Sequence, residues 1–335
     1  MEKYFLAGDV GGTKTLLAYY DFNRNCKEPS YLQSYPSDEY PTLQLLVKNH
    51  IDKSQIRPEF ISLGVAGPII HGVAQITNLN WVVSEKELSD TCYSIPANFI
   101  NDLASIAFSI PEFRDNDLEV INSGIPVEHG TIAVIAPGTG LGEGFMVWDG
   151  AGYRPYPSEG GHCDFSPNNL LECSLYKYLY KKYKHVSMER VCSGLGIPNL
   201  YMFLKKKKAA LEPAWLRKEL NKADDPTPII VNYAMEGRNE LCTLTLKLFI
   251  EILASEAGNL ALKFMATGGV YLGGGIPRRI VDKLKSPIFM QNFINKGRLS
   301  EMLMGFPVNV IMRSDAALIG AARHGYELIK KGRVG

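Results

Sequence analysis

The sequence predicts an α/β protein with two domains. Apolar segments typical of strands alternate along the chain with segments of helical periodicity, which is the pattern of α/β domains. The 335 residues exceed what a single hydrophobic core usually serves. A strand, a glycine-rich turn and another strand occur twice, around Gly12 and around Thr139. This repetition suggests a duplicated fold with a phosphate loop in each half, although two unrelated glycine-rich hairpins would give the same pattern.

The composition is that of an ordinary globular protein, with 46% hydrophobic and 21% charged residues. The net charge of +1 does not indicate a nucleic-acid-binding surface, and the basic run 205–208 is expected to be a solvated face. The cysteines form no C-x-x-C pair, which favours reduced thiols over disulfides or zinc; they are Cys26, Cys92, Cys163, Cys173, Cys192 and Cys242. No apolar stretch suits a signal peptide or a membrane span of roughly 18 residues. We therefore expect a cytoplasmic protein without nucleic-acid or membrane partners.

Strand and helix patterns alternate through the first hundred residues. Strands are expected over 4–10, 16–20, 60–66 and 73–77. A helix is expected after Pro41, because apolar residues follow at helical spacing; they are Leu43, Leu46, Val47 and Ile51. Ser84 and Glu87 form a capping-box pattern that begins the next helix.

The first motif is the glycine-rich turn Asp9-Val10-Gly11-Gly12-Thr13-Lys14 between the first two strands. Because Gly11 and Gly12 lack side chains, backbone N–H groups can approach an anion closely there. Thr13 adds a hydroxyl, and Asp9 could hold Mg²⁺ through water. A simple hairpin can also contain two glycines, but the acid in a buried strand makes that interpretation less attractive.

The second motif is the pair Asn101-Asp102, which follows an apolar segment and precedes a helical pattern. In an α/β protein this junction lies at the carboxyl end of a strand, where ligands bind. A carboxylate there can accept a proton from a substrate hydroxyl. The alternative is that Asp102 is only the N-cap of the following helix.

The second half repeats the strand, turn and strand pattern and then becomes mainly helical. The expected elements are strands over 118–121, 131–135, 144–148 and 308–312, helices over 171–179, 244–264 and from Asp315 to Leu328, and short helices with an exposed loop over 205–235. Gly258 is expected to mark close packing in the long helix. The glycine-rich turn 268–277 could let an adenine or ribose lie on the backbone, although a tight βα turn has the same sequence pattern.

Two further segments carry polar residues. Glu159 and His162 lie three apart around two glycines, which suits hydrogen bonding to a polyhydroxylated ligand. A metal site at His162-Cys163-Asp164 is not expected, because adjacent residues of an extended chain point to opposite faces. Ser187 is a candidate N-cap with Glu189 in the first turn, where a glutamate could also simply balance the helix dipole.

The commoner nucleotide-binding and hydrolytic motifs are absent. There is no G-x-x-x-x-G-K-[ST], and no G-x-G-x-x-G lies between a strand and a helix. G-x-S-x-G and H-E-x-x-H are absent as well.

Taken in order, six motifs resemble the bacterial glucokinase family across residues 4 to about 325. They are Asp9-Val10-Gly11-Gly12-Thr13, Asn101-Asp102, Ala136-Pro137-Gly138-Thr139-Gly140-Leu141-Gly142, Glu159-Gly160-Gly161-His162, His185-Val186-Ser187-Met188-Glu189-Arg190 and Leu272-Gly273-Gly274-Gly275. The resemblance implies a two-domain actin-like, hexokinase-like ATPase fold with ribonuclease H-like halves and an interdomain cleft. Its domains would be 1–112 plus 314–335 and 113–313. It also implies a homodimer that uses ATP and Mg²⁺ to phosphorylate D-glucose at the 6-hydroxyl, feeding glycolysis.

The family's residue roles can be assigned to matching positions. Asp102 matches the catalytic base, beside Asn101 in the sugar site. Glu159, His162 and Glu189 match ligands of sugar hydroxyls. The phosphate segments would comprise Asp9, Gly11, Gly12, Thr13, Lys14, Gly138, Thr139 and Gly140. Asp9 would also hold Mg²⁺ through water. The adenosine segment would comprise Gly273, Gly274 and Gly275.

Two departures and three alternatives accompany the resemblance. Position 14 is Lys, where close relatives often have Asn, which puts its phosphate contacts in doubt. The cysteine cluster of the related zinc-binding repressor/kinase group is absent, which indicates the zinc-free branch.

The alternatives are a kinase for another hexose, a non-catalytic sugar-binding protein of the ATPase fold, and a sugar-responsive transcription regulator. The last would need a DNA-binding domain ahead of the first phosphate loop, where eight residues precede Asp9.

Overall fold

The computed structural model describes residues 3–22, 28–76, 79 and 81–332. The chain divides into two compact units. Unit 1 comprises Met1–Arg114, Asp149–Pro157 and Arg313–Gly335, and unit 2 comprises Asp115–Trp148 and Ser158–Met312. The functional domains inferred from the sequence, 1–112 plus 314–335 and 113–313, stay a proposal; the units differ from them mainly in the segment 149–157. Cys26 and the end of the predicted strand at Thr77 lie outside the described residues.

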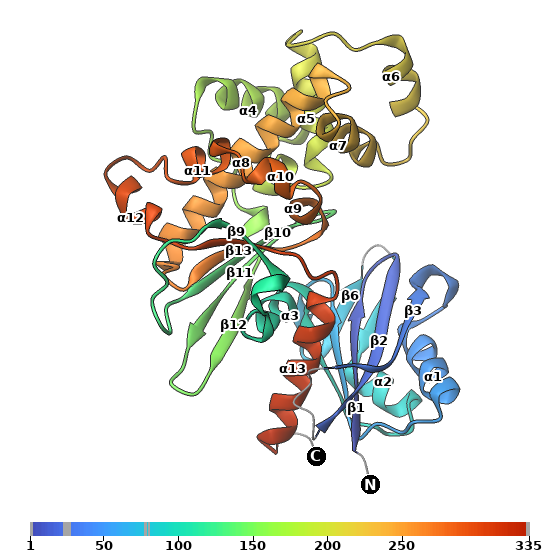
Figure 1. Ribbon diagram of the computed structural model, residues 1–335. Coiled ribbons are helices and arrows are strands. Elements are labelled where there is room, and N and C mark those ends of the chain that lie inside the picture. The colour runs from blue at the N-terminus through green and yellow to red at the C-terminus, as the bar shows by residue number, and fades with distance from the viewer. Residues whose placement is uncertain (1–2, 23–27, 77–78, 80, 333–335) are drawn as a thin grey trace. The chain divides into compact units, whose positions relative to one another are not determined.

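Unit 1 is built on a five-stranded sheet with the order β3-β2-β1-β4-β8 (Figure 1). Its strands are β1 Tyr4–Val10, β2 Lys14–Asp21, β3 Ser30–Pro36, β4 Ile61–Val65 and β8 Ala97–Asn101. β2 runs antiparallel to β1 and β3, whereas β4 lies parallel to β1 and β8. A smaller antiparallel sheet consists of β5 Ile69–Ile70, β6 Val73–Ile76 and β7 Trp81–Ser84.

Helices cover both faces of the sheet of unit 1, because residues of β1 alternate between two apolar clusters. Leu6 packs in the cluster of α1 Leu43–Ser54 and α2 Glu85–Thr91, whereas Phe5 packs in that of α3 Asp102–Ser109 and α13 Ala316–Lys330. Ser84 caps α2 as predicted, accepting a hydrogen bond from Glu87 N, and Thr42 caps α1 by accepting from Leu45 N. The short 3₁₀ helices of this unit are η2 Ser37–Glu39 and η4 Ile110–Glu112.

Helices α3 and α13 pack against each other with backbones in close contact. A Cβ added at Gly320 would lie 1.6 Å from the carbonyl oxygen of Ser105. The Ser105 hydroxyl donates to the carbonyl of Ala317 (2.7 Å). Asp315 precedes α13 but does not cap it as predicted; its carboxylate pairs with Arg313 instead.

Unit 2 contains most of a six-stranded sheet with the order β12-β11-β10-β13-β14-β9. The strands are β9 Leu118–Asn122, β10 Ile132–Pro137, β11 Leu141–Trp148, β12 Tyr153–Ser158, β13 Gly269–Leu272 and β14 Val308–Ile311. Most of the edge strand β12 falls within the segment grouped with unit 1. The strands from β12 to β14 repeat the order of the sheet of unit 1, and those from β11 to β14 repeat its directions: a glycine-turn hairpin beside two parallel strands. The predicted duplication is therefore present.

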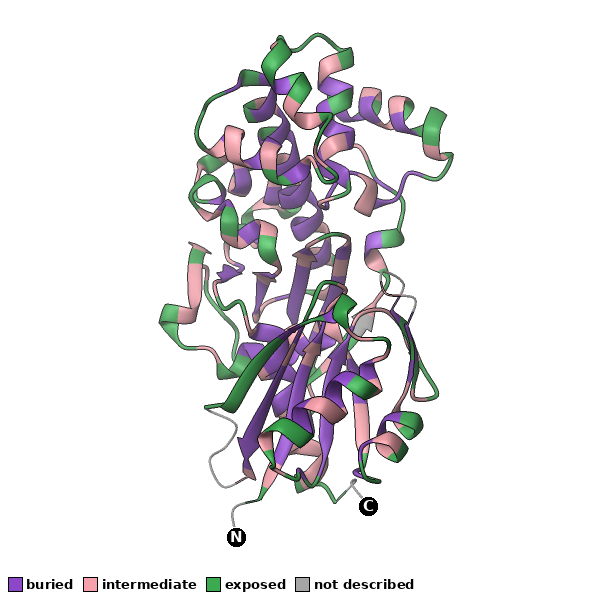
Figure 2. Ribbon diagram, turned by 90° about the vertical axis from the view of Figure 1, so that its right-hand side faces the viewer, coloured by how far each residue is buried: buried purple, intermediate pink, exposed green. Residues whose placement is uncertain are grey.

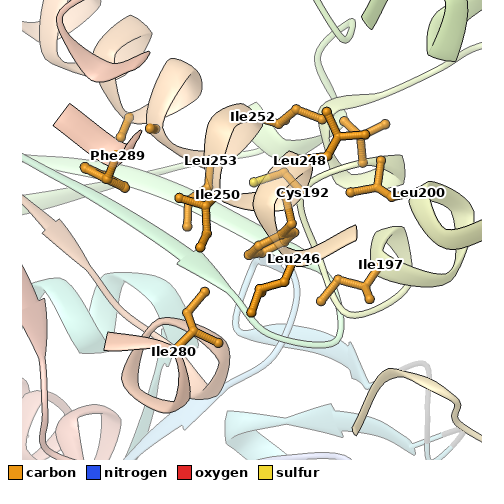
Figure 3. Packing of buried hydrophobic residues seen from close by; sticks show 14 of the residues in the cluster. Cys192, Ile197, Leu200, Leu246, Leu248, Ile250, Ile252, Leu253, Ile280 and Phe289 are labelled. Carbon is orange, nitrogen blue, oxygen red and sulfur yellow. The ribbon is translucent and has the colours of Figure 1, made fainter. Parts of the chain in front are cut away.

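The core of unit 2 surrounds α8 Glu240–Phe264, which confirms the predicted long helix. Figure 3 shows Leu246, Ile250 and Leu253 of this helix among side chains of neighbouring helices. Gly258 allows a close approach, because a Cβ there would lie 2.3 Å from the carbonyl oxygen of Phe293. The other helices of this unit are α4 Leu170–Tyr183, α5 Gly196–Lys206, α6 Ala214–Leu220, α7 Thr227–Met235, α9 Gly275–Arg279, α10 Val281–Leu284, α11 Pro287–Phe293, α12 Ser300–Met304, η5 Asp115–Asp117, η6 Gly160–His162, η7 Met188–Arg190 and η8 Gly297–Leu299.

Burial follows these elements closely. Figure 2 shows buried residues concentrated on the central strands and exposed residues on the outer sides of the helices. Within the described residues, no helix combines the length and apolar character needed to cross a membrane. The described cysteines are all free thiols.

Candidate active site

The first glycine-rich turn joins β1 and β2 as a tight hairpin in unit 1. Val10 pairs with Thr15, and Gly11 N donates to the carbonyl of Lys14 (3.0 Å). A Cβ at Gly11 would lie 2.9 Å from that same carbonyl oxygen, so a side chain would disturb the turn. The simple-hairpin interpretation and the phosphate-loop interpretation are therefore compatible, because this hairpin leaves Gly11 and Gly12 partly exposed and Thr13 and Lys14 exposed.

Ser37, which the sequence analysis did not single out, holds this turn in place. Its hydroxyl donates to the carbonyl of Gly11 (2.8 Å) and contacts the Thr15 hydroxyl (2.9 Å), and its N–H donates to the carbonyl of Thr13 (3.0 Å). Both hydroxyl-bearing residues, Ser37 and Thr15, are fully buried. No local pattern marks Ser37, because it comes from beyond the end of β3 and meets the turn only through the fold.

Asp9 lies on β1 directly before this turn, in an environment that disfavours its charge. The pKa of Asp9 is raised to about 6, mainly by burial and also by the negative charge of Asp102, while the positive charge of Lys14 opposes both effects. The structure therefore brings Asp9, Lys14 and Asp102 into electrostatic contact within unit 1. Two neighbouring carboxylates, one of them buried, favour a bound cation, which would lower the cost of keeping Asp9 ionised.

The alternative interpretation, in which Asp102 is only the N-cap of the helix, is wrong, because Asn101 occupies that position. Asn101 Oδ1 accepts from Ala104 N (3.1 Å), and Asn101 Nδ2 donates to the carbonyl of Gly67 (3.1 Å). Asp102 is the first residue of α3, and its Oδ1 accepts from Leu103 N (2.8 Å). Since the neighbour supplies the cap, capping does not explain the carboxylate at position 102.

The second glycine-rich turn joins β10 and β11 in unit 2. Gly138 N donates to the carbonyl of Gly140 (2.9 Å), and the carbonyls of Gly138 and Thr139 accept from Gly194 N (2.8 Å) and Leu195 N (3.1 Å). A Cβ at Gly138 would meet no heavy atom within 4 Å. The turn is thus fixed through its carbonyl groups on one side, while open space lies beside Gly138.

Glu189 contacts this turn directly. Its Oε2 accepts from Leu141 N (3.1 Å), and a Cβ at Gly140 would lie 2.5 Å from the same oxygen. The expected N-cap at Ser187 is wrong, since the Ser187 side chain makes no cap hydrogen bond and the segment is the short 3₁₀ helix η7. Glu189 is therefore placed by the glycine-rich turn, which gives it a more specific setting than a helix dipole.

Glu159 directly precedes η6 and His162 is its last residue, and η6 packs on β11. Their side chains are exposed by 66% and 62%, and His162 Nε2 lies 3.9 Å from Glu159 Oε2. A Cβ at Gly161 would lie 2.1 Å from the carbonyl oxygen of Leu141. The N–H group of Leu141 thus donates to Glu189, while the segment that carries Glu159 and His162 packs against the carbonyl group of Leu141.

The glycines of the third segment border the second turn. Gly273 N donates to the carbonyl of Ile135 (2.9 Å), and Gly274 has a φ of 84°. A Cβ at Gly274 would lie 2.7 Å from the carbonyl oxygen of Pro137. Gly275 begins α9 with open space at its Cβ position. The structure therefore gathers this segment, the second turn, Glu159, His162 and Glu189 within unit 2.

No group of three or more His, Cys, Asp or Glu residues suited to a metal ion occurs within the described parts of the chain. Asp164, two residues after His162 in the sequence, has its Oδ1 3.1 Å from His185 Nε2, and this contact joins two residues.

Comparison with known proteins agrees with this arrangement. The sequence matches the Glucokinase family over residues 6–327. It is 38% identical to the glucokinase of Trichormus variabilis, covering 95% of this chain and 97% of that protein. It is 33% identical to the glucokinase of Salmonella paratyphi B, covering 97% of each. The chain belongs to the glucokinase family.

Solved structures of glucokinases agree with this membership. The glucokinase from an Antarctic psychrotroph has 32% identity and a TM-score of 0.83, covering 98% of this chain and all of that one. The ROK-family glucokinase of Streptomyces griseus, at 18% identity, shares the fold with a TM-score of 0.65. The predicted hexokinase-like α/β fold is thus confirmed, and membership of the glucokinase family identifies the chain as a glucose kinase.

Proposed function

We propose that this glucokinase-family chain transfers the γ-phosphoryl group of ATP to the 6-hydroxyl of glucose, with Asp102 as the base. The observation that carries the proposal is the electrostatic contact of Asp102 with Asp9 beside the first glycine-rich turn. The proposal thus combines, within unit 1, a proton acceptor, a carboxylate suited to a cation and the backbone of a glycine-rich turn. Phosphoryl transfer depends on this kind of positioning and charge stabilisation.

Mg²⁺ fits the residues around Asp9. The raised pKa of Asp9 arises from burial and from Asp102, and a divalent cation held through water would offset both. When bound, Mg²⁺ would neutralise part of the negative charge of the phosphates. Asp9 would hold the hydrated ion, and Lys14 together with the turns 11–14 and 138–140 would contact phosphate oxygens. Gly273–Gly275 would contact the adenosine.

The sugar is positioned by polar side chains with remaining hydrogen-bonding capacity. Asn101 uses one N–H and one lone pair within the protein, which leaves one N–H and one lone pair for a sugar hydroxyl. Glu159 and His162 are exposed and close together, and Glu189 keeps a second carboxylate oxygen. Asp102 would accept the 6-hydroxyl proton as the oxygen bonds to phosphorus.

The phosphoryl donor is proposed to be ATP. The Streptomyces griseus structure contains glucose and AMPPNP, a non-hydrolysable ATP analogue, and shares the fold of this chain. We also propose that the reaction feeds glycolysis in the cytoplasm and that the chain forms a homodimer, as its family resemblance implies. Sedimentation analysis of the purified protein tests the dimer.

An ADP-release assay over a panel of hexoses tests the function, with Glu159→Gln, His162→Ala and Glu189→Gln beside the unaltered chain. We expect glucose to be the preferred substrate and each variant to raise the KM for glucose more than that for ATP. Each lost contact to a hydroxyl should cost about 1–3 kcal/mol. Preference for another hexose would correct the substrate, and variants that change only thermal stability would remove these residues from the sugar site.

EDTA should abolish the activity, and Mg²⁺ alone should restore it. A requirement for added Zn²⁺ would contradict the assignment to the zinc-free branch.

A further inference from the structure

Glu143 is a buried carboxyl group next to the segment that carries Glu159 and His162. It lies on β11 opposite Ile135 of β10, within unit 2, and is 1% exposed. Among the described residues, its Oε1 has no hydrogen-bond partner. A buried polar atom of this kind is costly and calls for a reason.

The carboxyl group of Glu143 lies directly against Gly160. A Cβ added at Gly160 would lie 2.1 Å from Glu143 Oε2 and 3.0 Å from Cδ. Gly160 does not have a positive φ, so backbone conformation does not require glycine there. A side chain at position 160 would instead have to displace the buried carboxyl group of Glu143. Ser158 adds a second link, because its hydroxyl donates to the carbonyl of Glu143 (2.9 Å) and accepts from Gly160 N (3.2 Å).

The charged groups around Glu143 come mainly from α8. The pKa of Glu143 is raised to about 8, mainly by burial and also by the negative charge of Glu256, while the positive charge of Lys263 opposes both effects. Lys263 is itself an ion-pair partner of Glu256 (3.4 Å), which also accepts from Asn259 Nδ2 (2.8 Å). Cys192 is another titratable group nearby, and its own pKa is raised by burial and by both carboxylates. Glu256 therefore has a cation and an amide as partners, whereas Glu143 is the carboxyl group better suited to carry a proton.

We propose that Glu143 is a positioning residue for glucose binding: its uncharged carboxyl group supports Gly160 and so fixes the backbone that presents Glu159 and His162. When Glu143 loses its proton, a charge is buried beside Glu256 and directly against Gly160. The segment 159–162 must then move to admit water. The inference rests on the proposed function, because it takes Glu159 and His162 as glucose ligands.

The pH dependence of the glucose KM distinguishes this role from a purely structural one. At about pH 9, roughly a tenth of the molecules keep Glu143 uncharged, so the glucose KM should rise about tenfold above its value near pH 7. The KM for ATP should change much less. Glu143→Gln keeps the shape without the charge, so it should retain glucose binding near pH 7 and abolish the alkaline rise. An equal rise in Glu143→Gln would overturn the proposal.

A second set of variants tests the contact with Gly160. Gly160→Ala places a methyl group against the Glu143 carboxyl, so the segment 159–162 must shift and the glucose KM should rise about tenfold. Adding Glu143→Ala removes the obstructing oxygens, so the double variant should recover part of that loss. Effects that simply add in the double variant would contradict direct coupling of the two residues.

Glu172→Gln is the matched control. Glu172 is also a buried carboxyl group of unit 2 with a raised pKa, but its oxygens bond to Asn168 and Asn169 at the start of α4. This control should keep the alkaline rise of the glucose KM. If Glu159→Gln and His162→Ala raise the glucose KM while Glu143→Gln keeps the full alkaline rise, the proposed function stands and this inference fails. If neither set affects it, the proposed glucose ligands fail as well.

Discussion

Asp9 and Asp102 show how two similar residues acquire different properties from their surroundings. Asp9 lies within a strand, where burial and the neighbouring carboxylate raise its pKa to about 6. Asp102 begins α3 and bonds to Leu103 N, while Asn101 caps the helix. The two carboxylates therefore suit the two different roles proposed for them, one beside a cation and one accepting a proton.

Asp102→Asn should lower kcat by about 10²-fold or more while glucose still binds. The amide keeps the size of the side chain and an oxygen for Leu103 N, but it cannot accept the proton of the 6-hydroxyl. The ADP-release assay measures turnover, and calorimetry measures glucose binding. Turnover near that of the unaltered chain would remove Asp102 from the role of base.

Asp9→Asn should stabilise the protein near neutral pH in the absence of nucleotide and metal, while reducing activity. The folded state holds the Asp9 proton more tightly than the unfolded chain, with a pKa raised from 3.8 to about 6. The unfolding free energy of the unaltered protein should therefore fall as the pH rises through that interval and level off above it. The gain from Asp9→Asn should reach at most about 3 kcal/mol. Denaturant unfolding from pH 4 to pH 8 measures it, and a gain independent of pH would contradict this origin.

The elements most important for the candidate site are the two glycine-turn hairpins and the helices that support them. Each hairpin is held by groups far away in the sequence: Ser37 in unit 1, and Glu189 with Gly194 in unit 2. In unit 1, the contact between α3 and α13 fixes the helix that begins with Asp102. Its close approach depends on Gly320, which lies against the backbone of Ser105.

Gly320→Ala should destabilise the protein by about 3 kcal/mol or more, because its methyl group would overlap the carbonyl of Ser105 and force α3 and α13 apart. Activity should fall as well, since Asp102 moves with α3. Gly152→Ala is the control: its Cβ would meet nothing within 4 Å, so stability should change by less than about 0.5 kcal/mol. Denaturant unfolding of both variants tests the difference, and equal effects would exclude helix packing as the cause.

The two compact units carry different parts of the proposed site. Unit 1 contains Asp9, Lys14, Asn101 and Asp102, and unit 2 contains Glu159, His162, Glu189 and the glycines of the second turn. The proposed ligands of glucose and of ATP therefore each come from both units. A ligand with contacts in both units favours those arrangements of the chain in which all of its contacts form.

Glucose should consequently strengthen ATP binding, and ATP should strengthen glucose binding by the same factor, because thermodynamic coupling is reciprocal. We expect a factor of about 5 to 150, which is typical of such coupling. Calorimetric titration of each ligand, with and without the other and with a non-hydrolysable ATP analogue, measures both factors. Independent affinities would show a preformed site, without contradicting the kinase assignment.

The sequence by itself determined the α/β class, the duplicated glycine-turn pattern and the order of the six motifs. These features are local or periodic: glycine pairs, apolar spacing and a polar pair at a strand end can be read from neighbouring residues. The long helix and the close packing at Gly258 were predictable for the same reason, and both are confirmed.

The tertiary structure alone decided which partner each side chain meets. Asn101 rather than Asp102 caps α3, Asp315 pairs with Arg313, and Glu189 bonds to Leu141 N. Ser37 and Glu143 carry no local signal, because their importance depends on contacts with residues brought near by the fold. Periodicity records which face of an element is buried, but hydrogen bonds and buried charges depend on distances between segments that only the folded chain sets.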